Sequence, residues 1–105
     1  MPAEQVIYLV DDEPDVLTGL GRLVRSAGYR VTTFQSAQAF LDQVGADDPG
    51  CVVLDLSMPQ MDGLALQNAL AARDVVLPII FLSGRAEVPR VVQSLKRGAL
   101  DFLMK

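Results

Sequence analysis

Apolar and polar residues follow one another in blocks along this chain, and the blocks predict a regular succession of strands and helices. Three short runs are almost entirely apolar and rich in β-branched or aromatic residues, as is typical of strands buried on both faces. They are residues 6–10 (VIYLV), 51–56 (CVVLDL) and 77–83 (LPIIFLS). Residues 29–34 (YRVTTF) and 101–105 (DFLMK) predict two shorter strands. We therefore expect a sheet built from these segments.

The segments between the strands place apolar residues three and four positions apart, which is the spacing of one helix face. Pro14 suits the first turn of a helix, and Gly28 can end that helix. The hydroxyl of Ser36 can cap the helix that follows it. The predicted helices cover residues 13–28, 37–45, 64–72 and 87–97.

Strands and helices thus alternate in the order β-α-β-α-β-α-β-α-β. This order predicts the α/β class, with parallel strands, helices on both faces of the sheet and right-handed crossovers. At 105 residues the chain is one domain or part of one. A sheet of this kind should gain a helix after its fifth strand. We therefore expect residues 1–105 to be one domain truncated at the fifth strand, with its final helix missing and an apolar face left bare.

Composition narrows the possible chemistry. The net charge is −4 and lysine and arginine do not cluster, so the chain is a poor nucleic-acid binder by itself. It contains no histidine, which excludes Ser-His-Asp and Cys-His catalysis and histidine metal sites. Its single Cys51 excludes an internal disulfide and is expected to be a small buried residue. No apolar run is long enough to span a membrane, so we expect a soluble cytoplasmic protein.

Polar residues stand where the predicted strands end. Asp11 and Asp12 follow the first strand, Asp55 lies at the end of the third, Ser83 ends the fourth and Lys105 ends the fifth. In open parallel sheets ligands bind at the carboxyl ends of the strands. We therefore expect these carboxylates, the hydroxyl and the ammonium group to meet at one edge.

This set of groups suits Mg²⁺ together with a phosphoryl group. Mg²⁺ takes oxygen ligands, often one or two carboxylates with phosphate oxygens and waters. Carboxylates packed together repel one another, and a divalent ion removes that repulsion. The carboxylate of Asp55 could act as a nucleophile and form an acyl phosphate. Lys105 could pair with the phosphoryl oxygens, and Ser83 could donate a hydrogen bond to one of them.

Four motifs resemble the receiver domain of bacterial two-component response regulators, most closely those of the FixJ/NarL type. They are LVDDEPDV (9–16), VVLDLSMPQMDGL (52–64), IIFLSG (79–84) and GALDFLMK (98–105). The resemblance covers essentially the whole chain and implies a flavodoxin-like, doubly wound sheet with strand order 2-1-3-4-5. It also implies a phosphorylation-dependent signalling switch.

The resemblance implies a role for each residue at the sheet edge. Asp55 would be the phosphoacceptor and also a ligand of Mg²⁺. Asp11 and Asp12 would be the acid pair that holds the ion, and the backbone carbonyl of Ser57 would be a further ligand. Lys105 would contact the phosphoryl group.

Two residues would form the switch that the resemblance implies. Ser83 would move toward the phosphoryl group, and Phe102 would turn inward in step with it. The phosphoryl group would come from a sensor histidine kinase. The output would be control of transcription through a DNA-binding domain outside this chain. A homodimer, altered by the missing helix, is a further expectation. The chain would not be a metabolic enzyme, since it would catalyse only its own phosphorylation and dephosphorylation.

Two rival functions remain open. A phosphatase of the haloacid dehalogenase type also uses an aspartate nucleophile, Mg²⁺ and lysine, but it should have a second aspartate where this chain has Ser57. A binding module that works without phosphorylation is the other rival, although such modules usually lose an acid or the lysine.

Glu13 and Asp15 are interpreted as acids that favour the start of a helix and not as part of the site.

Overall fold

The computed structural model describes residues 6–45, 50–56, 58, 61–83, 95–96, 98–99 and 101–104. The strands are β1 (Val6–Val10), β2 (Arg30–Phe34), β3 (Gly50–Asp55), β4 (Ile79–Ser83) and β5 (Asp101–Met104). The helices are α1 (Pro14–Ser26), α2 (Ala37–Gln43) and α3 (Gly63–Ala72). Each agrees with its predicted segment to within two residues at either end. The helix predicted over residues 87–97 lies largely outside the described residues.

The five strands form one parallel sheet in the order β2-β1-β3-β4-β5, which confirms the order that the resemblance implied. The register sets which strand ends are neighbours. Val10 lies opposite both Phe34 and Leu54, and Asp55 lies opposite Leu82. The residues that follow β1 therefore emerge beside the last residue of β3.

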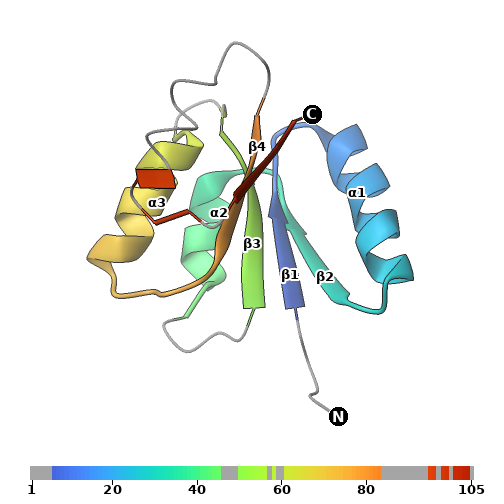
Figure 1. Cartoon of the computed structure of the whole chain (residues 1–105), viewed down its shortest axis with the longest axis horizontal. Helices are drawn as coiled ribbons and strands as arrows, with labels where there is room; N and C mark the ends of the chain where they lie inside the picture. The colour runs from blue at the N-terminus through green and yellow to red at the C-terminus, as the bar shows by residue number, and fades with distance from the viewer. Residues whose placement is uncertain are drawn as a thin grey trace.

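The helices form a layer on each face of this sheet (Figure 1). The larger cluster of buried residues packs α2 and α3 against one face, with Phe40 and Leu66 meeting Leu54 and Phe81 of the central strands. The smaller cluster lies on the α1 face, and its buried members are Leu9, Leu17, Val53 and Leu82. Successive residues of a strand point to opposite faces, so β3 and β4 supply both clusters.

Three helix boundaries are set by local signals in the sequence. The Ser36 hydroxyl oxygen accepts a hydrogen bond of 3.1 Å from the backbone N–H of Ala39, which confirms it as the cap of α2. Gly28 adopts a φ of 99°, a backbone conformation that glycine takes without strain, just after α1 ends. Pro14 is the first residue of α1.

None of the described helices has the length and apolar character needed to cross a bilayer.

An apolar hollow of about 390 Å³ lies between α1 and the strands on the α1 face. Cys51, expected to be buried, is only partly buried because it lines this hollow. The lining residues are Ile7, Leu23, Val24, Ser26, Ala27, Tyr29, Cys51, Val53 and Ile80.

We expect Cys51 to react slowly with thiol reagents at neutral pH. Its partial burial raises the pKa of the Cys51 thiol above the ordinary value of 9.0. The thiolate is the reacting form, and each unit by which the pKa rises lowers its fraction about tenfold at neutral pH. The rate of alkylation by iodoacetamide, followed by mass spectrometry, should therefore be lower at neutral pH than in the unfolded chain, and it should still be rising with pH at 9.0. The chain unfolded in urea is the control, and equal rates for both forms near neutral pH would contradict this expectation.

Candidate metal centre

Asp11 is held at the sheet edge by its backbone. Its N–H donates a hydrogen bond of 3.1 Å to the carbonyl of Phe34, which extends the pairing of β1 with β2 by one residue. One oxygen of its carboxylate, Oδ1, accepts a hydrogen bond of 2.9 Å from the backbone N–H of Glu13. The Asp11 side chain is only 1% exposed. Its carboxylate is therefore placed in a defined position under the turn that leads into α1.

Asp55 is the last residue of β3, and its side chain is also 1% exposed. The backbone just beyond it is fixed on two sides. The Leu56 N–H donates to the carbonyl of Leu82 in β4 at 2.9 Å, and the Leu56 carbonyl accepts from the N–H of Gly63 at 3.0 Å. These bonds hold the end of β3 between β4 and the start of α3, so the Asp55 carboxylate has little freedom to move.

The start of α3 packs closely against the same stretch of backbone. A Cβ atom added at Gly63 would lie 2.9 Å from the carbonyl oxygen of Asp55 and 3.0 Å from the Cα of Leu56. The helix itself begins at a cap, because Oδ1 of Asp62 accepts a hydrogen bond of 2.9 Å from the N–H of Ala65. An aspartate immediately before a helix-forming segment was the signal for this cap.

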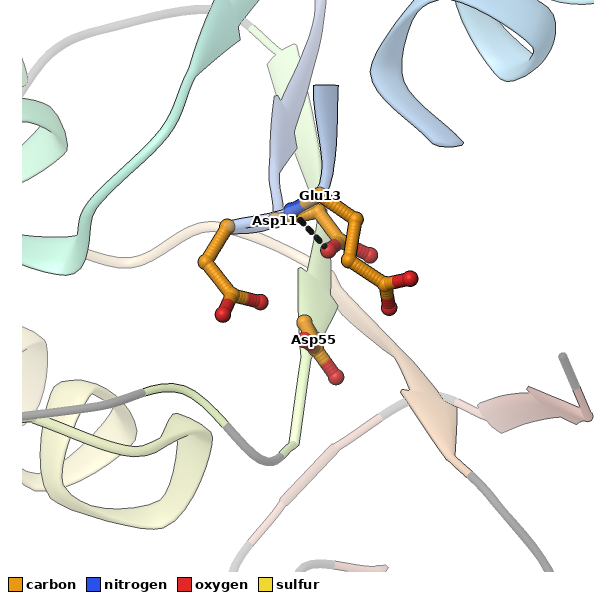
Figure 2. A group of neighbouring side chains, drawn as sticks. Asp11, Glu13 and Asp55 are labelled. Atoms are coloured by element: carbon orange, nitrogen blue, oxygen red, sulfur yellow. Dashed lines mark hydrogen bonds between the residues drawn. The ribbon is translucent and has the colours of Figure 1, made fainter. Parts of the chain in front are cut away.

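The acids of β1 and β3 meet in one cluster. Asp11, Asp12, Glu13 and Asp55 each present a carboxylate oxygen, and the four oxygens lie within 4.8 Å of one another. Figure 2 shows the Asp11 and Glu13 side chains extending from the end of β1 toward Asp55. Asp11 and Asp55 are buried, whereas Asp12 and Glu13 are more open to solvent. The cluster thus has a buried floor and an accessible mouth.

The donor set of this cluster suits a hard divalent cation. Four negative charges at this separation repel one another strongly, more so where two of them are buried. The ligand atoms are all carboxylate oxygens, which Mg²⁺, Ca²⁺ and Mn²⁺ prefer over nitrogen or sulfur. A bound divalent ion would replace the repulsion with attraction. The arrangement could therefore hold a metal ion next to the carboxylate of Asp55.

Glu13 also belongs to this cluster, although its place in the sequence indicated only the start of a helix. It is the N-cap residue of α1, but its side chain makes no capping hydrogen bond to the helix. Its carboxylate oxygen lies instead with those of Asp11 and Asp55. Asp15 lies in the first turn of α1 and is exposed, as expected for an acid at a helix start. The only feature of the sequence that could have indicated Glu13 as part of the site is its position directly after Asp11 and Asp12.

Of the remaining predicted site residues, the structure describes two and leaves two outside the described residues. Ser83 ends β4, is fully buried, and lies beside the strand that carries Asp55. Phe102 lies in β5 opposite Phe81 and is partly buried against the larger core cluster. Ser57 and Lys105 lie outside the described residues. The structure therefore brings Ser83 to the same sheet edge as Asp55.

Comparison with known protein families identifies the domain. The family model described as "Response regulator receiver domain" matches residues 7–105. The chain belongs to this family. The resemblance read from the four sequence motifs is confirmed, and the acidic cluster lies at the sheet edge of a receiver domain. Receiver domains of response regulators interact with sensor kinases.

Relatives of known name are similar to this receiver domain over nearly its whole length. The response regulator protein TmoT of Ectopseudomonas mendocina is 50% identical over 102 residues, covering 97% of this chain and 46% of that protein. The transcriptional regulatory protein FixJ of Bradyrhizobium diazoefficiens is 42% identical over 99 residues, covering 94% of this chain and 48% of that protein. This receiver domain therefore spans about half the length of these relatives.

Solved structures confirm the flavodoxin-like receiver fold. The response regulator StyR superposes with a TM-score of 0.91 at 41% identity, covering 98% of this chain and 52% of that one. The crystal structure of FixJ-N superposes with a TM-score of 0.90 at 35% identity, covering 97% of this chain and 82% of that one. The doubly wound architecture predicted from the sequence is thus the architecture of its family.

Proposed function

We propose that this receiver domain is a phosphorylation-controlled switch in which Asp55 accepts a phosphoryl group from the phosphohistidine of a sensor histidine kinase. The observation that carries the proposal is the buried carboxylate of Asp55 within 4.8 Å of three other acids at a sheet edge. A buried charge among like charges destabilises a fold, so this arrangement favours a site with a chemical role. Membership of the receiver family supports the same role.

The transfer would be a single exchange of bonds at phosphorus. An oxygen of the Asp55 carboxylate forms a bond to phosphorus while the phosphorus–nitrogen bond of the kinase phosphohistidine breaks. The bonding electrons leave with the imidazole, which takes up a proton. The backbone bonds of Leu56 to β4 and to Gly63 hold the end of β3 in place, so the nucleophile is oriented before the donor arrives.

The neighbouring acids fit a role in binding Mg²⁺. The carboxylates of Asp11, Asp12 and Asp55, with the backbone carbonyl of Ser57, would hold the ion. When bound, Mg²⁺ neutralises the charge of the acids and of the phosphoryl oxygens. Without that neutralisation, the acidic cluster would repel an anionic phosphoryl donor.

The switch itself would follow from the new charge on Asp55. A phosphoryl group adds negative charge and strong acceptor oxygens, which the Ser83 hydroxyl and the Lys105 ammonium group would bind. Ser83 is suitably placed at the end of the neighbouring strand. We propose that Phe102 then turns inward and that the surface around β5 changes between two pre-existing arrangements.

The proposed output is control of transcription. Relatives of this domain include a transcriptional regulatory protein, and this chain corresponds to about half of that relative. A DNA-binding domain outside residues 1–105 would read the state of the switch, in the cytoplasm and in some cases as a homodimer. The chain would act as a signalling domain and not as a metabolic enzyme, because it would catalyse only its own phosphorylation and dephosphorylation.

Incubation with acetyl phosphate and Mg²⁺ tests this function. We expect intact-mass spectrometry to show the addition of one phosphoryl group, and we expect none when EDTA replaces Mg²⁺. Hydroxylamine should remove the group, because it cleaves acyl phosphates and leaves phosphoserine intact. A chain that gains no mass with Mg²⁺, or gains it equally with EDTA, would contradict the proposal.

A further inference from the structure

Glu13 is positioned for a role that its place in the sequence does not indicate. It stands at the N-cap position of α1, where a side chain usually accepts a hydrogen bond from the first turn. Its side chain makes no such bond, and its backbone is extended, with φ −95° and ψ 111°. The carboxylate lies with those of Asp11 and Asp55, as Figure 2 shows. The side chain is therefore directed into the acidic cluster and not onto the helix.

The size of the cluster bears on how Glu13 would meet an ion. Two oxygens on opposite sides of a Mg²⁺ ion are about 4 Å apart, because each Mg–O bond is about 2 Å long. The four carboxylate oxygens lie within 4.8 Å of one another, a space only slightly wider than one coordination shell. Mg²⁺ usually takes one or two carboxylates directly and keeps several waters. The most exposed acids of the cluster are therefore the ones placed to bind those waters.

We propose that Glu13 is an outer carboxylate of the cation site, which holds the ion through its bound water and raises the affinity of the receiver domain for Mg²⁺. This inference rests on the proposed function, because it takes the Asp11, Asp12 and Asp55 site as the place where the ion binds. Glu13 is exposed, whereas Asp11 and Asp55 are buried, so the Glu13 carboxylate lies at the accessible mouth of the cluster. It thus adds negative charge on the side from which a hydrated ion enters.

The competing explanation is that Glu13 acts only on the helix. An acid near a helix N-terminus stabilises the helix dipole, and any nearby negative charge attracts a cation weakly at long range. Asp15 allows the two explanations to be separated. It is an exposed acid in the first turn of the same helix and lies outside the acidic cluster. Asp15→Asn removes the same charge as Glu13→Gln from nearly the same place.

The test is isothermal titration of the 105-residue chain with Mg²⁺ in the absence of any phosphoryl donor. We expect Glu13→Gln to bind Mg²⁺ about tenfold more weakly than the wild type. This is the low end of the range of about 10–100-fold that is typical of residues that contact a metal through its ligands, because Glu13 is exposed. We expect Asp15→Asn to change the affinity by less than about twofold. Raising the salt concentration should reduce the Glu13→Gln defect, because the carboxylate is accessible to solvent. Thermal unfolding in EDTA verifies that both variants fold.

The outcomes distinguish this inference from the proposed function. The metal site and the role of Glu13 are both supported if the wild type binds Mg²⁺, Asp55→Asn does not, and Glu13→Gln binds it more weakly while Asp15→Asn binds it normally. The role of Glu13 is overturned if Glu13→Gln binds Mg²⁺ as tightly as the wild type does, or if Asp15→Asn weakens Mg²⁺ binding by the same factor. Either result leaves the metal site itself unaffected. If the wild type binds no Mg²⁺, the metal site of the proposed function fails and the role of Glu13 fails with it.

Discussion

The Asp55→Asn variant is expected to take up no phosphoryl group from acetyl phosphate in the presence of Mg²⁺, under conditions that phosphorylate the wild type. The asparagine amide has nearly the shape of the carboxylate but is not a nucleophile toward phosphorus. Asp55 is the last residue of β3, and the backbone just beyond it is hydrogen bonded to β4 and to Gly63, so this nearly isosteric substitution should leave the fold unchanged. Intact-mass spectrometry measures the result directly.

A stability measurement verifies that the loss is chemical. Asp55→Asn removes one of four clustered negative charges, so in EDTA it should be at least as stable as the wild type, and more stable by up to about 1 kcal/mol. Asp42→Asn is the matched control, because Asp42 is an exposed acid in α2 that accepts a hydrogen bond from Gln38 outside the cluster. It should be phosphorylated like the wild type. If Asp55→Asn is phosphorylated at the wild-type rate, Asp55 is not the phosphoacceptor.

The Gly63→Ala variant is expected to be less stable than the wild type by about 1–3 kcal/mol, the usual range for forcing an extra methyl group into close packing. The added Cβ would lie 2.5 Å from a ring carbon of Phe81 and 2.9 Å from the carbonyl oxygen of Asp55. Neither contact can be relieved by rotating a flexible side chain, because Phe81 is fully buried and the other atom is backbone. The start of α3 would have to move away from β3. Urea unfolding measures the loss.

Gly19→Ala provides the control for the glycine substitution. Gly19 lies in α1, and a Cβ added there would meet nothing within 4 Å. Alanine favours a helix over glycine, so this variant should gain about 0.5–1 kcal/mol of stability. If Gly63→Ala lowers the free energy of unfolding and Gly19→Ala raises it, the contacts at Gly63, and not the loss of glycine, cause the destabilisation. A neutral Gly63→Ala would show instead that α3 shifts easily, and the rigid placement of Asp55 would then be wrong.

Local sequence signals determined most of the elements of this domain. Apolar runs and helical spacing placed every described strand and helix, because these patterns reflect which side of an element is buried. Ser36 and Gly28 marked helix boundaries through interactions within a few residues. The ends of the strands also identified Asp11, Asp12 and Asp55 as one site, since parallel strands end at a common edge.

The strand order was not accessible to the same reasoning. Alternating strands and helices predict a parallel sheet, but they do not determine which strands are neighbours. The order came from the resemblance of four motifs to receiver domains, and the sheet confirms it. The pairing of β1 with β3 is what places Asp11 beside Asp55, although the two residues are far apart in the chain.

The sequence by itself thus determined the elements, the Ser36 cap and the strand end at which each acid lies, because each of these depends on residues close together in the chain. Tertiary structure decided three further features. Glu13 turns into the acidic cluster and away from its helix, Cys51 borders a hollow, and Gly63 must remain small beside Asp55. Each of these depends on which distant segment lies next to the residue, and packing sets that neighbour only after the sheet and its helices have come together.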